Sequence, residues 1–405
     1  MHIVFANRYY APDMAATSQI VSDLAAQLAA SGYTVEVITS RQRYDDPLAG
    51  LPSRETLDGV RVHRIWTSTF GRANLAGRAV DYLSFYLSFF FTCLRTLKRD
   101  SVLVCCTDPP LLSIPAALAC FLTRARLVNW LQDIYPEVAV ALGIASASSP
   151  LTRALVWLRN HSLRRAHRNV VLGEVMAAKV QSAAVDPRRV SIIHNWSLTP
   201  PGEPAPGGAA NPLRRSWGIA DSFVIGYSGN LGRAHEIETL LQAAQILRQQ
   251  HNVRFLVIGG GHYTRTLQSR AADVQLDNIV FQPYQPLEKL ALSLAAADVH
   301  LVILRPEMEG CIVPSKFYGA AASGRPVIFL GSLDGELARI LARADAGISI
   351  ATGDGPGLAA SIGQLREDPD ACQRLGSNAR RLCTTTYTRE NALRQWLSML
   401  EELGR

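Results

Sequence analysis

Cysteine is scarce in this sequence and is never placed as metal sites require. The 405 residues contain seven cysteines, no two of which form a Cys-x-x-Cys pair. Most lie in apolar runs, which favours reduced, buried side chains in a cytosolic protein over a disulfide scaffold. No metal cluster is expected. The seven are Cys93, Cys105, Cys106, Cys120, Cys311, Cys372 and Cys383.

Long apolar runs are also missing. The uncharged run Tyr82–Leu94 is shorter than the roughly 20 residues that a spanning helix needs, and the run 101–122 is interrupted at Asp108, Pro109 and Pro110. We therefore expect no membrane-spanning helix. The first residues, MHIVFANRYYAPD, lack a basic segment followed by an apolar core, so they predict a strand and a loop rather than a signal peptide.

Acidic residues are outnumbered by basic ones. The chain has 41 Lys and Arg against 34 Asp and Glu, a formal charge of +7 and a pI near 9.1. This balance suits an anionic partner, which can be a nucleotide, a phospholipid surface or a nucleic acid. No nucleic-acid-binding module is present and no aromatic platform is interleaved with the basic residues, so we expect no nucleic acid partner.

Strand and helix patterns alternate along the whole chain, which is too long for a single core. Such alternation predicts an α/β protein with two doubly wound parallel sheets. Strand patterns occupy 2–6, 33–40, 60–66, 101–107, 125–133, 169–173 and 189–195, then 222–230, 253–261, 278–282, 299–304 and 325–330; helix patterns occupy 18–32, 236–250, 263–274 and 287–297.

A segment rich in Pro, Gly and Ala, 199–212, separates the two halves and predicts a linker. We expect one domain over 1–198 and a second over 199–385. The amphipathic pattern of 386–405 predicts a final helix that packs back across the domain junction. In doubly wound sheets, ligands bind beyond the carboxyl ends of the strands, so two halves facing each other would bind across a cleft.

Glycine loops follow two strands of the second half. Gly229 and Gly232 follow one strand, with Arg233 and His235 beside them, and residues 259–261 are all glycine after the next. Glycine lets the backbone approach a phosphate closely, and a following helix start favours an anion. The alternative is that these glycines only turn strands into helices.

The segment EGCIVPSKFYGAAASGRPVIF, residues 309–329, contains further candidates. Ser315 and Lys316 precede an alanine-rich helix whose first amides are suited to a diphosphate, and Glu309 is placed to accept hydrogen bonds from sugar hydroxyls. The alternative is a solvated loop acid and a solvated lysine.

Together with other segments, these motifs resemble the GT-B glycosyltransferases of family 4, in particular the branch that builds bacterial exopolysaccharide, O-antigen and colanic-acid-like units. The matching segments occur in the family's order over nearly the whole chain. They are FANRYYAPDMAATSQIVSDLAAQLAASGYTVEVITS, TDPPL, WLQDIYPE, IIHNW, YSGNLGRAHEIETLLQAA, VFQPYQP, AADVHLVIL and VPSKFYGAAASGRPVIF.

The resemblance implies a retaining, metal-independent transfer from a nucleotide sugar, with no cofactor. Glu309 resembles the first acid of the family's paired-glutamate motif, and Asp133 resembles the polar residue that faces the acceptor and the anomeric carbon. The implied diphosphate-binding residues are Gly229, Asn230, Gly232, Arg233, Ser315 and Lys316.

The resemblance also implies contacts to the base and the sugar, and a loop of the first domain over the phosphates. The base and sugar residues are His235, Phe281, Pro283, Gly310, Cys311 and Pro314, of which Phe281 and Pro283 belong to the stretch 280–283 whose backbone reads the nucleobase. The loop residues are Asp13, Thr17 and Ser18.

Three positions depart from the family pattern. Where the second glutamate binds ribose, this chain has Gly319 or Phe317, depending on the alignment. The usual arginine and lysine of the phosphate loop fall near Asn230 and His235. The usual glycine pair of the first loop is replaced by residues 15–17, Ala-Ala-Thr.

The acceptor implied by this branch is a polyprenyl-diphosphate-linked saccharide at the cytoplasmic face of the membrane. The segment from Arg153 to Arg168 contains five arginines and two histidines with no acid, a pattern typical of a membrane-surface helix. The alternative is a solvated helix face. The aromatic run YLSFYLSFFF predicts either a buried helix or a partly exposed, lipid-facing groove. We expect a cytoplasmic protein held peripherally at the inner face of the membrane.

The favoured donor is a UDP-sugar, and a GDP-sugar comes next. Two other functions stay open. A nucleotide-sugar epimerase uses the same pair of domains, and the missing second glutamate is compatible with a catalytically decayed nucleotide-binding scaffold.

Overall fold

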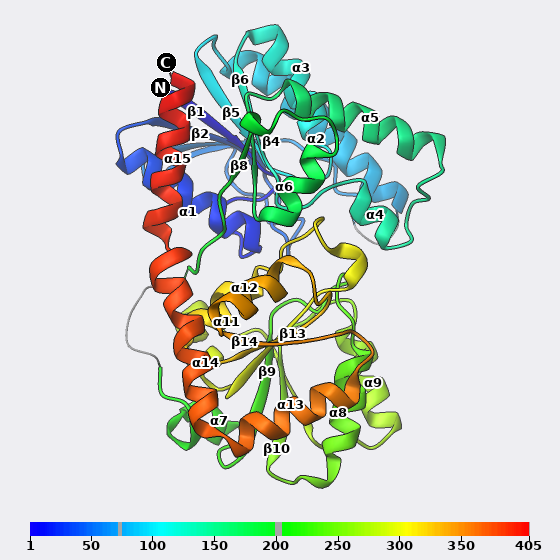
Figure 1. Ribbon diagram of the computed structural model, residues 1–405. Coiled ribbons are helices and arrows are strands. Elements are labelled where there is room, and N and C mark those ends of the chain that lie inside the picture. Colours follow the sequence, from blue (N-terminus) through cyan, green and yellow to red (C-terminus); the bar gives the residue numbers. More distant parts are fainter. Residues whose placement is uncertain (72–74, 199–204, 405) are drawn as a thin grey trace. The chain divides into compact units, whose positions relative to one another are not determined.

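The computed structural model describes residues 1–71, 75–198 and 205–404, which form two compact units with one sheet each (Figure 1). Unit 1 comprises Met1–Asn195, Gly310–Ile312 and Glu390–Arg405, and unit 2 comprises Trp196–Glu309 and Val313–Arg389, less the residues outside the described ranges. The first part of the expected linker, 199–204, lies outside these ranges, and the expected division at 198 and 385 stays a prediction.

The sheet of unit 1 has eight described strands in the order β3-β4-β2-β1-β5-β6-β7-β8. Seven are parallel, but β3 pairs antiparallel with β4 at one edge and was not predicted. The strands are β1 His2–Ala6, β2 Thr34–Ser40, β3 Arg54–Leu57, β4 Val60–Ile65, β5 Ser101–Cys105, β6 Arg126–Trp130, β7 Arg168–Val171 and β8 Val190–Ile192.

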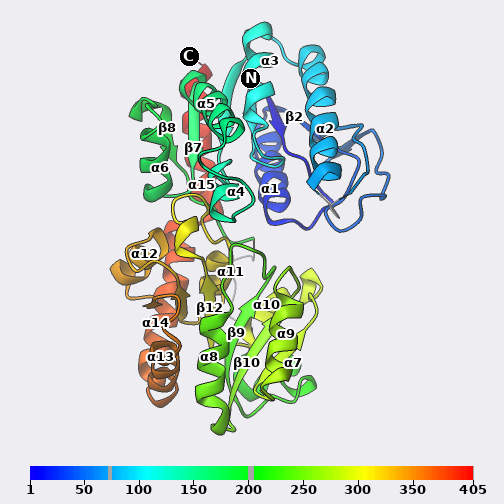
Figure 2. The ribbon, with the colours of Figure 1, turned by 90° about the vertical axis from the view of Figure 1, so that its right-hand side faces the viewer.

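Helices cover both faces of this sheet (Figure 2). They are α1 Ala16–Ala30, α2 Leu75–Thr96, α3 Ser113–Thr123, α4 Glu137–Ala141, α5 Pro150–Arg165, α6 Glu174–Gln181 and α15 Arg389–Gly404. Phe85 and Phe89 of α2 and Ala116 of α3 pack with Val4 and Leu103, which point to one face of the sheet.

The opposite face holds the last helix. Trp396 of α15 packs edge-on against Trp130 with ring centroids 4.8 Å apart, and Trp130 in turn contacts Phe5 at 6.5 Å. Both tryptophans are fully buried. Because Val4 and Phe5 are neighbours in β1, they point to opposite faces, and so the two helix layers share one strand.

The sheet of unit 2 has six described strands, all parallel, in the order β11-β10-β9-β12-β13-β14. They are β9 Phe223–Ser228, β10 Val253–Ile258, β11 Ile279–Gln282, β12 Val299–Ile303, β13 Val327–Leu330 and β14 Gly347–Ile350. The helices are α7 Pro212–Ser216, α8 Glu238–Ile246, α9 Thr264–Asp273, α10 Leu290–Ala295, α11 Lys316–Ala322, α12 Glu336–Ala344, α13 Gly355–Glu367 and α14 Pro369–Arg381. The predicted α/β class with two doubly wound parallel sheets is confirmed.

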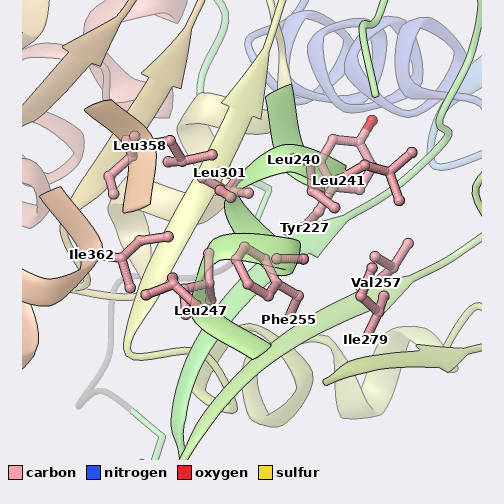
Figure 3. Packing of buried hydrophobic residues seen from close by; sticks show 14 of the residues in the cluster. Tyr227, Leu240, Leu241, Leu247, Phe255, Val257, Ile279, Leu301, Leu358 and Ile362 are labelled. Atoms are coloured by element: carbon pink, nitrogen blue, oxygen red, sulfur yellow. The ribbon is translucent and has the colours of Figure 1, made fainter. Parts of the chain in front are cut away.

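The core of unit 2 is mostly aliphatic, with a few aromatic side chains (Figure 3). Phe255 and Leu301 from the central strands pack with Leu240 of α8 and with Leu358 and Ile362 of α13. At about 25 cal/mol per Å² of apolar surface removed from water, each such side chain contributes roughly 1.5–3 kcal/mol relative to an exposed position. Burial on both faces therefore keeps functional polar groups out of the middle of the sheet.

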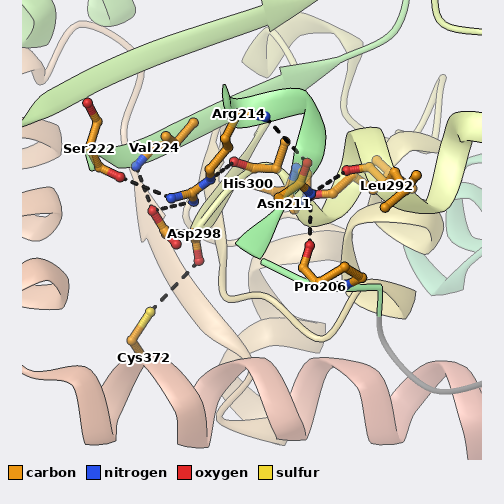
Figure 4. Close-up of polar contacts among 11 residues, drawn as sticks. Pro206, Asn211, Arg214, Ser222, Val224, Leu292, Asp298, His300 and Cys372 are labelled. Carbon is orange, nitrogen blue, oxygen red and sulfur yellow. Dashed lines mark hydrogen bonds and ion pairs between the residues drawn. The ribbon is translucent and has the colours of Figure 1, made fainter. Parts of the chain in front are cut away.

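A buried arginine ties α7 to the sheet (Figure 4). Arg214 is 2% exposed, and its guanidinium donates to the Ala296 and Ser222 carbonyls at 2.7 and 3.0 Å. It also pairs with Asp298 at 2.6 Å, and Asp298 accepts the Val224 N–H at 2.7 Å. The carboxylate thus balances a charge that would otherwise be buried alone.

All seven cysteines lie in the described part of the chain as free thiols; Cys372 is half-buried and the others are buried, as predicted. Within the same ranges, the structure contains no helix whose length and apolarity would let it span a bilayer.

Asp298→Ala is expected to lower the free energy of unfolding by about 3–5 kcal/mol, because removing one partner of a buried ion pair leaves the other charge uncompensated. Urea unfolding of the full chain measures the change. Arg270→Ala is the matched control, since it breaks the exposed pair with Glu238 and should remove at most about 1 kcal/mol. Equal losses in the two variants would contradict the role given to Asp298.

Candidate active site

The strand order of unit 2 reverses between β9 and β12, and the region beyond the carboxyl ends of these two strands is called the crevice of unit 2. From β9 the chain proceeds to β10 and β11 on one side, and β12, β13 and β14 lie on the other. The loops after β9 and β12 therefore leave neighbouring strands in different directions, which is where doubly wound sheets bind ligands. The Arg305 N–H donates to the Ala234 carbonyl at 2.9 Å and joins the two loops.

The predicted glycine loops form one hydrogen-bonded platform. The Leu231 N–H donates to the Gly260 carbonyl at 2.7 Å, and the Tyr263 N–H donates to the Leu231 carbonyl at 3.0 Å. Gly261 has a φ of +131°, and a Cβ there would lie 2.4 Å from the Asn230 Oδ1. The close approach of the two loops requires glycine. Asn230 is exposed at the rim of the platform.

Lys316, the first residue of α11, reaches back to this platform. Its Nζ lies 3.0 Å from the His235 Nε2 and 5.6 Å from the centroid of the Tyr227 ring. A Cβ on Gly229 would lie 2.9 Å from the lysine Cε, so the glycine leaves room for the lysine stem. No ion pair of Lys316 with an acid is found among the described residues.

Burial shifts both titratable groups of this contact toward their neutral forms. Desolvation lowers the Lys316 pKa to about 8. Desolvation and the nearby Lys316 charge lower the His235 pKa to about 3, so the imidazole is neutral at pH 7. The Gly232 carbonyl, 3.0 Å from the His235 Nδ1, can only accept. Nδ1 therefore holds the proton, and Nε2 accepts from the lysine. His235 thus orients Lys316.

Glu309 is fixed by a helix start. It follows the short 3-10 turn Pro306–Met308 after β12, and its Oε1 accepts the Glu336 N–H, the first of α12, at 2.9 Å. A Cβ on Gly335 would lie 2.4 Å from the Glu309 Oε2. The predicted sugar-contacting acid is therefore half-buried and held by backbone, rather than a solvated loop acid.

The remaining predicted diphosphate residues lie at the outer edge of the crevice. Arg233 is exposed in the loop between β9 and α8, and Ser315 is exposed at the N-cap position of α11. Pro314, before Ser315, is buried. The platform, Lys316 and His235 are thus linked by direct contacts, whereas Arg233 and Ser315 only adjoin them in the chain.

The predicted base-binding residues lie two strands away, at the end of β11. Phe281 is half-buried against the core and Pro283 is exposed. Tyr284, which the sequence analysis did not single out, is 60% exposed, and a Cβ on Gly259 would lie 3.2 Å from its ring. An aromatic residue directly after the predicted 280–283 stretch is the signal that could have identified it.

Gly310 and Cys311 belong to unit 1, whereas the other predicted base and sugar residues belong to unit 2. The Cys311 carbonyl accepts the Ile134 N–H at 2.8 Å, and its thiol accepts from the Lys179 ammonium at 2.8 Å. Burial raises the Cys311 pKa despite this ammonium. The segment therefore forms part of the surroundings of the Asp133 loop.

The region beyond the carboxyl ends of β1 and β5 is called the crevice of unit 1. The strand order reverses there too, and the Arg8 N–H donates to the Asp108 carbonyl at 2.6 Å to join the two loops. Thr107 Oγ1 accepts the Asp133 N–H at 3.2 Å, which attaches the loop after β6. Burial and the Asp108 charge raise the pKa of Asp133 to about 7. Burial and the charge of Asp133 raise the pKa of Tyr135.

Sequence reasoning missed a buried cation in this crevice. Arg8 is 4% exposed; its guanidinium lies 5.3 and 5.1 Å from the ring centroids of Tyr9 and Tyr82 and donates to the Gln42 side chain at 3.0 Å. Tyr82 comes from α2, so this helix contributes to the crevice. In the stretch NRYYAPD the sequence analysis gave a role to Asp13 but none to Arg8.

Of the three predicted residues of the first loop, Asp13 has hydrogen-bond partners in the backbone. The buried Asp13 carboxylate accepts the Ala15 N–H at 2.8 Å and also accepts the Tyr44 N–H. Thr17 and Ser18 lie in the first turn of α1, half-buried and buried respectively. Asp13 therefore shapes the loop with both of its oxygens.

Among the described residues, no three His, Cys, Asp or Glu side chains are grouped so that they could hold a metal ion.

Comparison with known proteins gives matches over both units. A family model described as a glycosyl transferase 4-like domain matches residues 16–196, and one described as glycosyl transferases group 1 matches residues 211–382. WbjE of Pseudomonas aeruginosa, named as a glycosyltransferase, is 29% identical over 67% of each chain. WcaI of Escherichia coli K12, named for colanic acid biosynthesis, is 24% identical over 96% of this chain and 97% of its own.

Solved structures show the same fold at low identity. HepE of Anabaena, solved in complex with UDP, has a TM-score of 0.72 and 17% identity, covering 99% of this chain and all of that chain. WaaG, a glycosyltransferase involved in lipopolysaccharide biosynthesis, has a TM-score of 0.71 and 16% identity over 96% of this chain and 98% of its own. The chain belongs to the family 4 glycosyltransferases and has their GT-B fold.

Proposed function

We propose that this protein transfers a sugar from a nucleotide sugar, with UDP-sugar favoured over GDP-sugar, to a lipid-linked saccharide in bacterial surface polysaccharide biosynthesis. The transfer is retaining and independent of metal. The single observation that carries the proposal is the desolvated Lys316 ammonium, held against neutral His235 beside the glycine platform. A cation without an acidic partner in such a crevice suits an anionic ligand.

The relatives favour this donor and this class of product. HepE was solved with UDP and with UDP-glucose. The names of WcaI and WaaG refer to colanic acid and lipopolysaccharide. We infer from these a nucleotide sugar and a surface glycan for this chain.

In the proposed reaction the bond between the anomeric carbon and the diphosphate breaks, and negative charge grows on the leaving diphosphate. Lys316 and Arg233 stabilise that charge by electrostatics, with the backbone amides of Gly229, Asn230 and Gly232 and the hydroxyl of Ser315 as donors. His235 acts as a positioning residue, because it fixes the direction of the lysine. Phe281, Pro283 and Pro314 line the base and sugar region.

Glu309 accepts hydrogen bonds from the donor sugar in this proposal. Since one of its oxygens caps α12, truncation to Ala would remove both a cap and a sugar contact. Glu309→Gln keeps an oxygen acceptor for the cap, and it is therefore the variant that isolates the contact to the sugar.

Asp133 takes the proton of the acceptor hydroxyl or orients that hydroxyl as it attacks the anomeric carbon. A carboxyl with a pKa of about 7 is suited to proton transfer at neutral pH. The loop after β1, which contains Asp13, and the first turn of α1, which contains Thr17 and Ser18, follow the carboxyl end of β1 at the same crevice.

The proposed acceptor requires access to a membrane surface at the inner face of the cytoplasmic membrane. The expected basic helix is shorter than predicted, since α5 ends at Arg165. Arg159 is buried and paired with Glu137, and Arg168 lies in β7 paired with Glu402. Arg153, Arg164 and Arg165 remain exposed. We propose that these three, rather than all five arginines, bind lipid phosphates.

Melting of the protein with UDP, GDP, dTDP, CMP and ADP tests the proposed donor. A ligand at 100 times its dissociation constant adds about 2.7 kcal/mol of stability. We expect the largest shift with UDP and its loss in Lys316→Ala, whereas Lys289→Ala, which removes an exposed lysine of the same unit, keeps it. An unchanged shift in Lys316→Ala would contradict the site.

Incubation with UDP-sugar alone, without acceptor, separates the transferase from the epimerase. Conversion of the free nucleotide sugar to its epimer would identify the protein as an epimerase and contradict the proposed function. Nucleotide binding without any transfer to an acceptor would favour the decayed scaffold.

UDP affinity is expected to fall as the pH rises above about 8. The free enzyme holds Lys316 protonated only below that pH, and so binding of the diphosphate at higher pH must take up a proton. Calorimetric titration with UDP between pH 7 and 9.5 measures the affinity. We expect the affinity to fall roughly tenfold per pH unit once the pH is well above 8. Lys316→Met should bind more weakly with a flat profile. A flat wild-type profile would show that Lys316 does not contact the anion.

The kcat/KM for acceptor is expected to fall as the pH is lowered through about 7. The raised pKa of Asp133 means that its ionised form is present mainly above that pH. The loss should approach tenfold per pH unit well below 7. Asp133→Asn should be far less active and lack this dependence. If kcat/KM of Asp133→Asn falls at low pH as it does in the wild type, another group is responsible for the pH dependence.

A further inference from the structure

Helix α2 has two apolar faces, of which only one is covered by the protein. Phe85, Phe89 and Cys93 point into the core of unit 1. On the other side, five large apolar side chains follow one another at spacings of three or four residues, which align on one helix face. They are between 37% and 57% exposed: Val80, Leu83, Leu87, Phe91 and Leu94.

The neighbouring helices extend this exposed side. Helix α3 packs against both α2 and α5, and the Ser162 hydroxyl of α5 donates to the Ser113 carbonyl of α3 at 2.9 Å. Leu118, Phe121 and Leu122 of α3 are 52–68% exposed, and Leu151, Trp157 and Leu158 of α5 are 37–69% exposed. These six residues and the five of α2 are called the apolar face. A group of this size is unusual on a protein surface that meets only water.

Acids are absent from this surface. The only acid of α2 is Asp81, which is buried and accepts from the Ser68 hydroxyl and the Phe70 N–H at 2.7 and 3.0 Å. Helices α3 and α5 have no acidic residue at all.

Basic residues collect at one end of the apolar face. Helices α2, α3 and α5 each lead into the parallel neighbours β5, β6 and β7, so their last turns lie at the same edge of the sheet. The exposed basic residues at these ends are called the basic rim; one exposed acid, Asp100, lies among them. The rim consists of Arg95, Lys98, Arg99, Arg124, Arg164 and Arg165.

We propose that the apolar face docks on an anionic phospholipid bilayer. Its side chains enter the boundary between headgroups and acyl chains, and the basic rim binds lipid phosphates. Charge complementarity favours this occupant over a second copy of the chain, because two copies would bring like charges together around the contact. The inference rests on the proposed function in one respect: the lipid-linked acceptor of that function gives the protein a reason to bind a membrane.

The same helix connects the docking surface to the crevice of unit 1. Tyr82 lies under the Arg8 guanidinium, and the Tyr86 hydroxyl donates to the Pro110 carbonyl in the loop after β5. One face of α2 therefore borders the Asp133 crevice while the other meets lipid, which brings a membrane-anchored acceptor to that crevice.

Flotation of the full chain with vesicles of phosphatidylcholine, with and without phosphatidylglycerol, tests the proposal. The wild type should float with the mixed vesicles and should be released by salt. Leu87→Glu with Phe91→Glu should need at least tenfold more lipid for half-maximal binding. Leu287→Glu with Leu333→Glu, at exposed leucines of unit 2, is the matched control and should bind like the wild type.

Two further measurements keep the result decisive. Melting and the UDP-induced shift of each variant show that it is folded, since all four substituted side chains are exposed. Wild-type binding that survives in Leu87→Glu with Phe91→Glu would overturn the proposal. So would an absence of vesicle binding by the wild type, or a dimer that the double variant dissociates. Vesicle binding without any nucleotide binding would instead support the proposed docking surface and contradict the proposed function.

Discussion

Burial of parallel strands on both faces is the constraint on which the rest of this structure depends. Strands such as β1, β5 and β12 have no solvent-facing side, so polar chemistry can only be placed where strands end. In each sheet the strand order reverses beside the first strand, and the two loops there are joined by a backbone hydrogen bond. Lys316, His235 and Glu309 surround one such point, and Arg8, Asp108 and Asp133 surround the other.

Desolvation then gives the two crevices their chemical character. Lys316 and Asp133 carry opposite charges when ionised. Burial lowers the pKa of Lys316 to about 8 and raises the pKa of Asp133 to about 7. An ammonium that has lost water gains most from an anionic ligand, whereas a carboxyl near its pKa can accept a proton and release it again. The neutral His235 imidazole serves the first group, because an acid in its place would neutralise the charge that the ligand requires.

Sequence periodicity was sufficient for the fold because most strands are buried runs and the longer helices have helical spacing. It failed for β3, a solvent-facing edge strand without an apolar run, and for β14, whose residues are all half-buried. It also assigned no helix to residues 336–381, where α12, α13 and α14 lie. Motifs located the glycine loops and Lys316, but the contact between Lys316 and His235 joins residues 81 apart. No local sequence pattern marks Arg8 as a buried residue. Arg159 was interpreted as a solvated residue because its partner Glu137 lies 22 residues away in the chain.

The aromatic run YLSFYLSFFF shows why neither of its two sequence interpretations was complete. A helix that is apolar on all sides is normally surrounded by protein or by lipid. Here Phe85 and Phe89 are buried in the core of unit 1, whereas Leu83, Leu87 and Phe91 contribute little to that core because they remain largely exposed. Polar side chains would satisfy folding equally well at those positions. The apolar side chains are explained once a partner outside the protein covers them, and the basic rim beside them selects an anionic one.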